Sequence, residues 1–194
     1  LVKSLGNQAM IMRNWGKLEE AMALNKEQER ISRQMGNLDG LQASLGNKAA
    51  ILLDWGKLEE AMALLKEEER ICRQLGNLDY LSRSLGTQAL ILDRWGKPEE
   101  AMAQYKEQER IWRHLGNLNF LSASLANQAM ILRRWGKVEE AMALLNESEH
   151  ICRQLGSPNS LQRSLGNQAL ILKSWGKLEE AMALHKEEER ICRQ

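Results

Sequence analysis

The chain has little proline, few aromatic residues and almost no valine or threonine. With two prolines and 14 glycines among 194 residues, it has too little of either for a collagen-like or low-complexity disordered protein. No apolar run approaches the roughly 18 residues that a membrane-spanning helix requires. Helix-favouring Ala, Leu, Glu, Gln, Lys, Arg and Met dominate, while strand-favouring Val and Thr are scarce. The composition predicts an all-α protein that does not cross a membrane.

Cysteine is also scarce, and its pattern excludes two common uses. Cys72, Cys152 and Cys192 are odd in number and none lies in a CxxC pair, so the sequence predicts neither a disulfide framework nor a zinc site. We expect reduced thiols that act as small apolar residues, and hence a reducing, cytoplasmic location. No Ser/His/Asp set, Cys/His set or phosphate-binding loop is present. The sequence therefore predicts no enzyme, no metal site and no cofactor.

A period of 40 residues runs through the whole chain. A tryptophan followed by Gly-Lys marks each copy, at Trp15, Trp55, Trp95, Trp135 and Trp175. A Glu-Glu-Ala-Met-Ala segment follows each of them, as at residues 19–23. Five full copies would need six more residues than the chain has, so we expect it to begin inside a first helix and to stop before a closing loop. The predicted repeats, of which the first and last are incomplete, are residues 1–36, 37–76, 77–116, 117–156 and 157–194.

Each copy divides into two helical segments. In the second copy the pattern predicts helices from Leu38 to Asp54 and from Leu58 to Leu75, with Asn37 or Asp39 as N-terminal cap of the first. Gly76 fits the left-handed position that follows a helix end. Apolar residues recur at i, i+3 and i+4, so each helix has one face to bury. A single hairpin cannot bury these faces alone, whereas stacked hairpins can, which predicts a solenoid.

The recurring pattern resembles the tetratricopeptide repeat (TPR). In residues 167–184 the small residue, the large residue, the turn glycine and the second small residue of a TPR correspond to Ala169, Leu172, Gly176 and Ala181. A TPR usually has about 34 residues, and longer repeats are similar to those of kinesin light chain, of polarity adaptors with Leu-Gly-Asn repeats and of bacterial sensor arrays. The resemblance implies a right-handed α-solenoid of five helix-turn-helix repeats that binds protein or peptide on a concave wall of first helices.

Two features depart from the TPR pattern or are unusual. Late in the second helix, where the family has a small apolar residue, the chain has polar ones: Gln28, Glu68, Gln108, Ser148 and Glu188. Buried polar groups need partners, and the candidates lie early in the first helix: Gln42, Ser82, Ser122 and Gln162. In the third repeat Trp112 replaces a residue that is Cys in three other copies, and we expect a partly exposed aromatic there. The Trp-Gly-Lys tryptophans are expected to pack at the turn.

By the resemblance, the wall contains columns with one residue from each repeat. One column carries an amide in four repeats and a threonine in the third, at Asn7, Asn47, Thr87, Asn127 and Asn167. A carboxamide has a donor and an acceptor that complement a peptide backbone, so the column is a candidate ladder for an extended peptide. The small residue before each amide, such as Gly166, would let the peptide approach, and Thr87 and Ala126 would interrupt the ladder. The alternative is that the amides bond a neighbouring helix or their own backbone.

Charge and apolar contact extend this predicted peptide site. Eight basic residues fall on the wall: Lys3, Arg13, Arg83, Arg94, Arg133, Arg134, Arg163 and Lys173. Only Asp54 and Asp93 oppose them, although the chain as a whole has a net charge of +1. Such asymmetry favours an acidic peptide or protein tail as partner, unless the cations pair with glutamates of the second helices. A neighbouring column contributes apolar side chains, at Met10, Leu90, Met130 and Leu170.

Other functions and one column of residues stay open. A different class of function is a structural solenoid that associates head to tail, because the copies are alike and the end faces are uncapped. RNA binding is disfavoured, since the aromatic content of 5% lies mostly in the tryptophan column and leaves few stacking platforms. No role follows from the sequence for the column that succeeds the amides: Gln8, Lys48, Gln88, Gln128 and Gln168.

Overall fold

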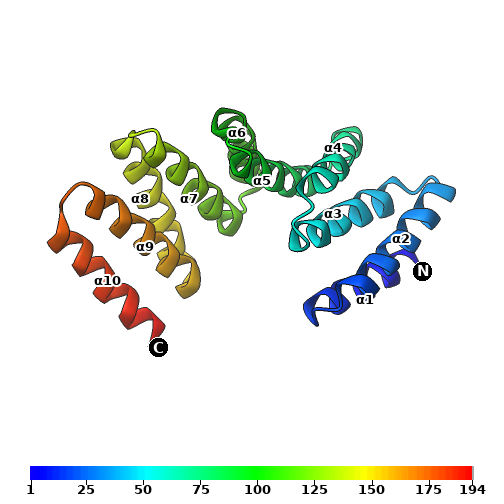
Figure 1. The fold of residues 1–194 in the computed structure, drawn as a ribbon, viewed down its shortest axis with the longest axis horizontal. Helices are drawn as coiled ribbons and strands as arrows, with labels where there is room; N and C mark the ends of the chain where they lie inside the picture. Colours follow the sequence, from blue (N-terminus) through cyan, green and yellow to red (C-terminus); the bar gives the residue numbers. More distant parts are fainter. Residues whose placement is uncertain (194) are drawn as a thin grey trace. The chain divides into compact units, whose positions relative to one another are not determined.

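The computed structural model describes residues 1–193; the last position of the fifth predicted repeat, Gln194, lies outside the described residues. These residues form ten helices in five helix-turn-helix pairs, without a strand (Figure 1). The helices are α1 Val2–Asn14, α2 Leu18–Gln34, α3 Leu38–Asp54, α4 Leu58–Leu75, α5 Leu78–Arg94, α6 Pro98–Leu115, α7 Leu118–Arg134, α8 Val138–Gln154, α9 Pro158–Ser174 and α10 Leu178–Cys192. The prediction of an all-α helical repeat is confirmed, and α3 and α4 have the predicted bounds.

The chain divides into two compact units, unit 1 from Leu1 to Gln104 and unit 2 from Tyr105 onward. In unit 1 each second helix packs between two first helices, α2 between α1 and α3 and α4 between α3 and α5. In unit 2 α8 packs between α7 and α9 in the same way, and α10 packs against α9. First helices also touch one another, α1 with α3, α3 with α5, and α7 with α9. Each unit therefore presents a continuous wall of first helices.

Local sequence explains where the helices begin and end. The Asn37 side chain accepts a hydrogen bond from the backbone N–H of Gly40 at 3.0 Å, so Asn37 and not Asp39 caps α3. The turn glycines adopt the left-handed conformation, with φ between 59° and 75° at the nine such positions in residues 1–193. Gly76, for example, has φ 67° at the end of α4, where a residue with a Cβ would be strained.

Trp112 is fully buried, so the prediction of a partly exposed aromatic is wrong. Its ring stacks on Phe120, with centroids 4.8 Å apart, and packs with Leu121, Leu125 and Ile151 in the core of unit 2. Cysteine fits the same column elsewhere because that column faces the core in every complete repeat. The larger ring is accommodated where the chain also supplies an aromatic residue at position 120.

The Trp-Gly-Lys tryptophans pack only in part. Trp15 is 67% exposed and Trp135 is 37% exposed, so one side of each ring faces solvent. The Lys57 ammonium lies 5.7 Å from the centre of the Trp55 ring, and equivalent cation–π contacts join Lys17 to Trp15 and Lys177 to Trp175. These contacts stabilise the turns that follow Trp15, Trp55 and Trp175.

The column of Gln8, Lys48, Gln88, Gln128 and Gln168 holds successive repeats together. The Gln88 amide donates to the Glu69 carboxylate at 2.8 Å, and the Gln168 amide donates to Glu149 at 2.6 Å. Gln128 bonds Glu109 in the same way within unit 2. Each of these bonds runs from a first helix back to the second helix of the preceding repeat. Gln8, at the first position of the column, bonds only Ser4 within its own helix.

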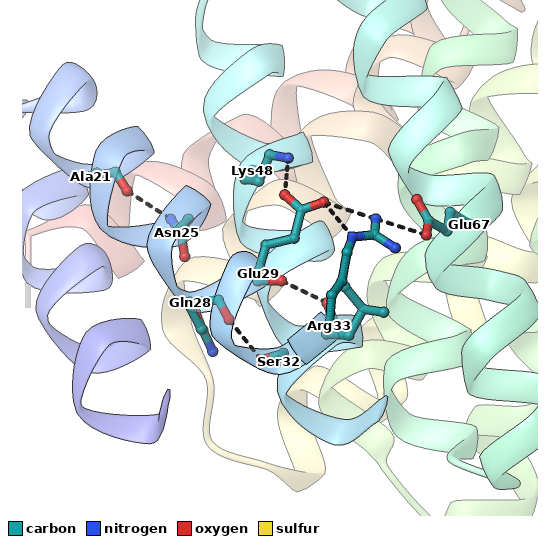
Figure 2. Close-up of polar contacts among 10 residues, drawn as sticks. Ala21, Asn25, Gln28, Glu29, Ser32, Arg33, Lys48 and Glu67 are labelled. Atoms are coloured by element: carbon teal, nitrogen blue, oxygen red, sulfur yellow. Dashed lines mark hydrogen bonds and ion pairs between the residues drawn. The ribbon is translucent and has the colours of Figure 1, made fainter. Parts of the chain in front are cut away.

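A lysine and an arginine extend the same junction in unit 1 (Figure 2). Glu29 of α2 pairs with Lys48 of α3 and with Arg33 one turn later in α2. Arg33 in turn reaches Glu67 of α4 at 2.9 Å. The Glu29 carboxylate therefore links α2, α3 and α4 through Lys48 and Arg33. Because Lys48 and Glu29 are largely buried, their ion pair stabilises the fold more than an exposed surface pair does.

Removing a junction amide is expected to weaken the fold by a modest amount. Gln168→Ala should lower the free energy of unfolding by about 1–2 kcal/mol, because the buried amide donates to a charged acceptor. Gln8→Ala is the matched control and should cost less than about 0.5 kcal/mol, since Gln8 is exposed. Urea denaturation followed by circular dichroism measures both. Equal losses in the two variants would contradict a role of this column between repeats.

Candidate functional site

The wall of unit 1 is hollowed at two adjoining places. The hollows measure about 690 Å³ and 470 Å³ and share Ala43, Asn47, Tyr80 and Arg83 as lining residues. All nine wall residues predicted in this unit line one hollow or both: Lys3, Asn7, Met10, Arg13, Asn47, Arg83, Thr87, Leu90 and Arg94. The structure therefore brings the predicted amide, basic and apolar columns of unit 1 to one surface.

The amide column is only partly engaged by the protein itself. The Asn47 Nδ2 donates to Asn25 Oδ1 of α2 at 3.3 Å, and the Thr87 hydroxyl donates to a backbone carbonyl of its own helix at 2.9 Å. Asn7, Asn127 and Asn167 have no side-chain hydrogen bond within residues 1–193. The alternative, bonding within the protein, thus applies to Asn47 and Thr87, while the peptide ladder stays a prediction. Asn7 and Asn127 are also exposed, so their amides are open to a ligand.

The glycines that precede the amides serve packing inside each repeat. A Cβ on Gly46 would overlap the Glu68 carboxylate of α4, and a Cβ on Gly6 would lie 3.0 Å from the Gln28 amide of α2. In the fourth repeat α8 has the shorter Ser148, and the preceding position of α7 is Ala126. Gly6 and Gly46 therefore make room for polar side chains of the second helices, and approach of a peptide at these small residues stays a prediction.

The polar residues of the second helices find different partners in different repeats. Ser148 donates to the backbone carbonyl of Ser122 at 3.0 Å, and Gln162 donates to Glu188 at 3.5 Å, so the expected partner column is used in unit 2. In unit 1 Gln42 accepts from the Cys72 thiol at 3.2 Å instead. The Gln28 Oε1 is buried without a hydrogen-bond partner in residues 1–193.

Glu68 is the most perturbed acid of unit 1. It is 3% exposed and lines the 470 Å³ hollow. Burial raises its pKa to about 7, while a hydrogen bond with Ser84 and the charge of Arg83 act in the opposite direction. The carboxyl therefore exchanges its proton near neutral pH. Burial, with a contribution from Glu68, also raises the pKa of the Cys72 thiol to about 12, which makes this cysteine unreactive.

Two basic residues of the wall in unit 1 are neutralised by aspartates. Arg13 of α1 donates to both carboxylate oxygens of Asp54 in α3, at 2.8 and 3.2 Å. Arg83 pairs with Asp79 one turn earlier in α5 at 3.0 Å. The strongly basic wall predicted from the sequence is therefore reduced in unit 1, because half of the predicted cations there have an acidic partner.

The basic excess of the wall is concentrated in unit 2. Helices α7 and α9 contain no aspartate or glutamate but carry Arg133, Arg134, Arg163 and Lys173. The Nε of Arg133 is buried and has no hydrogen-bond partner in the described part of the chain. Met130 is half-buried and Leu170 is 44% exposed on the same helices. Helices α7 and α9 of unit 2 thus carry Arg133, Arg163 and Lys173 together with apolar side chains and the Asn127 and Asn167 amides.

The described residues lack two particular features. Among residues 1–193 no group of three or more His, Cys, Asp or Glu side chains is arranged to hold a metal ion. None of the ten helices in that range is both long enough and apolar enough to cross a membrane.

Comparison with known proteins identifies the repeat. The family model described as tetratrico peptide repeat matches residues 47–115 and 88–187, which together cover most of the chain. No curated protein matches the sequence.

Solved structures share the fold at low sequence identity. BtubC (BKLC) from P. vanneervenii is 19% identical, with a TM-score of 0.89 over 100% of this chain and 80% of that one. A putative kinesin light chain from P. anserina with nearly identical TPR-like repeats is 21% identical, with a TM-score of 0.78 over 98% and 94%. The apo quorum sensor NprR from B. thuringiensis is 14% identical, with a TM-score of 0.80 over 100% and 54%. At these identities the comparisons show the fold alone.

Proposed function

Because this chain belongs to the tetratricopeptide repeat family, we propose that it is a non-catalytic protein-interaction scaffold that holds an extended peptide along its walls of first helices. The observation that carries this proposal is the gathering of the predicted wall residues of unit 1 around two adjoining hollows. The structural similarity to a quorum sensor and to a kinesin light chain supports an interaction role. The three free cysteines support a reducing, cytoplasmic location.

We propose that the amides form hydrogen bonds with the peptide backbone and that unit 2 prefers peptides with acidic side chains. Asn7 in unit 1 and Asn127 in unit 2 are exposed and keep both their donor and their acceptor for a ligand. Asn47 keeps only part of this capacity, because one of its N–H groups bonds Asn25. Arg163 and Lys173 have no acidic residue on their own helix, so they attract carboxylates of the peptide.

Loss of the two exposed amides is expected to weaken peptide binding about tenfold. Asn7→Ala plus Asn127→Ala removes up to two hydrogen bonds from the peptide bound to each unit, each of which contributes about 0.5–1.5 kcal/mol, and a loss of about 1.4 kcal/mol is tenfold. Fluorescence anisotropy with a labelled Glu-Ser peptide of about ten residues, which spans roughly 33 Å when extended, measures the change. The matched control is Asn146→Ala, an exposed amide on the second helix α8. An equal loss in the control, or none in the double variant, would contradict the ladder.

The same titration tests the acidic preference separately. A Lys-Ser peptide of equal length should bind more weakly than the Glu-Ser peptide, and added salt should weaken the Glu-Ser peptide most because it screens the cations of α7 and α9. Equal binding of both peptides would contradict the acidic preference, while the scaffold and its amides would stand.

A second candidate function, from a different class, is head-to-tail self-association. Ile11 in α1 is 47% exposed, whereas its counterpart Ile51 in α3 is fully buried. Met182 in α10 is 56% exposed, whereas its counterpart Met22 in α2 is 6% exposed. The faces that repeats use to pack on one another are therefore exposed on α1 and α10 within residues 1–193, and the two faces are of the kinds that pack on each other between internal repeats.

A further inference from the structure

Unit 1 contains a further hollow, formed by residues that do not belong to the wall proposed for a peptide. It measures about 400 Å³. Its lining comes from α2, α3, α4 and the turn between α3 and α4, and consists of Met22, Lys26, Lys48, Leu52, Trp55, Lys57, Glu60, Ala63 and Leu64. None of these nine residues lines either of the two hollows of the wall. This lysine hollow is therefore a separate site.

The inner surface of the lysine hollow is apolar. Met22 of α2 and Leu52 of α3 are only 6% and 5% exposed, so they lie at its base. Trp55 and Leu64 are half-buried and add an aromatic and an aliphatic side chain. A volume of about 300–1,000 Å³ and a mostly apolar lining with a few polar groups are typical of small-molecule sites. The lysine hollow meets both criteria.

The charged residues of the lysine hollow favour an anion. Its lining contains three lysines and one glutamate. Lys48 pairs with Glu29 of α2 (Figure 2), and Lys57 pairs with Glu60 at 3.4 Å. Lys26 is exposed, and its side chain has no acidic or hydrogen-bonding partner within residues 1–193. The Lys26 ammonium therefore keeps its three N–H donors for a ligand.

The next repeat of unit 1 lacks two features of the lysine hollow. At the positions 40 residues later, Gln88 replaces Lys48 and Gln104 replaces Leu64, while the other seven residue types are the same. Gln88 uses its amide to bond Glu69. The chain thus has a cation and an apolar side chain in this hollow where the following repeat has two amides. This difference provides a comparison surface inside the same unit.

We propose that the lysine hollow binds a small organic anion in which an apolar body, such as an aromatic ring system, carries one carboxylate. The apolar body lies against Met22, Leu52 and Leu64, and its burial supplies most of the affinity. The carboxylate accepts a hydrogen bond from the Lys26 ammonium, and the positive charge of the lysines selects an anion over a neutral molecule. The site shares no residue with the wall, so it goes beyond peptide binding and does not depend on it.

Isothermal titration calorimetry of the full 194-residue chain with naphthalene-2-carboxylate tests the site. We expect one molecule to bind per chain. The neutral naphthalene-2-carboxamide should bind about tenfold more weakly, because it cannot form a charge-assisted hydrogen bond with Lys26. Added salt should weaken binding of the carboxylate and leave binding of the carboxamide unchanged.

Two substitutions give the lysine hollow residues that the chain carries at the same positions of other repeats. Lys26→Asn introduces the residue of Asn146, and Leu64→Gln introduces the residue of Gln104, so both suit the fold, which circular dichroism checks. Each should weaken binding of the carboxylate about tenfold, the first by removing the free ammonium and the second by placing an amide against the apolar body. Only Leu64→Gln should also weaken binding of the carboxamide.

The matched control is Lys66→Asn, the same change at the equivalent position of α4. Lys66 is exposed and does not line the lysine hollow, so the affinity for the carboxylate should stay the same. Equal weakening by Lys26→Asn and Lys66→Asn would show that the anion does not bind at Lys26 and would overturn the placement of the site.

Three other results bear on the proposal. If naphthalene-2-carboxylate does not bind at about 1 mM, the site is overturned. Equal affinities for the carboxylate and the carboxamide contradict the preference for an anion. The variant with Asn7→Ala plus Asn127→Ala should bind the carboxylate as the original chain does. Failure of peptide binding by the walls and failure of the lysine hollow are therefore distinguishable.

Discussion

Trp112→Ala is expected to lower the free energy of unfolding by about 3–5 kcal/mol, because it leaves a cavity in a close-packed core. The ring is fully buried, stacks on Phe120 and packs with Leu121, Leu125 and Ile151. Urea denaturation followed by circular dichroism at high signal-to-noise measures the loss. A cost below about 1 kcal/mol would show that the core of unit 2 does not depend on this ring.

Three further variants separate ring volume from residue type. Trp135→Ala removes a tryptophan that is 37% exposed and should cost less than about 1 kcal/mol. Trp112→Phe keeps an aromatic ring and removes an indole N–H that is buried without a partner in residues 1–193, so it should cost about 1 kcal/mol. Trp112→Cys, which restores the residue found at Cys72 and Cys152, should still cost about 3 kcal/mol, because Phe120 remains sized for a ring.

Glu68→Gln is expected to stabilise the chain at alkaline pH, by about 2–3 kcal/mol at pH 8. Burial makes the ionised carboxylate unfavourable, and the neutral amide has the same shape without this cost. Gln28 and Gln108 occupy the same column in two other repeats, which shows that the position accepts an amide.

The pH dependence of stability has a definite sign. The pKa of Glu68 is about 7 in the folded chain against an ordinary value of 4.5, so the folded state binds the proton more tightly than the unfolded state. Glu68 therefore makes its full contribution to the free energy of unfolding below pH 4.5. This contribution is lost as the pH rises from 4.5 through about 7. Glu68→Gln should remove this decline, so that the variant and the original chain are nearly equal at pH 4 and diverge toward pH 8.

Denaturant titrations at several pH values measure this divergence. The control is Glu188→Gln, the same change in the same column of α10, where the side chain is only half-buried. It makes the same chemical change at a more exposed carboxylate and so measures the effect of the amide without the burial of Glu68. If Glu68→Gln and the original chain keep the same difference in stability at pH 4 and pH 8, ionisation of Glu68 in the folded state is not the cause.

The sequence alone determined the local structure of this protein. Periodic apolar stripes, the turn glycines and a cap such as Asn37 act within a few residues of one another, so the bounds of α3 and α4 follow from the helical period and from backbone preference. The period of 40 also placed Asn7, Asn47 and Thr87 in one column, and the structure places them on one hollowed surface. These inferences needed only spacing along the chain.

Only the tertiary structure decided what each column contacts. Gln168 bonds Glu149 on another helix, Arg13 is neutralised by Asp54 in the next repeat, and Gly46 gives room to Glu68. Trp112 is buried because its face of α6 packs in the core of unit 2. A helical period tells which residues share a face, but it does not tell which side chain of another helix lies opposite. That choice depends on how the helices pack, since the ridges and grooves of both surfaces set the separation and register of their contacts.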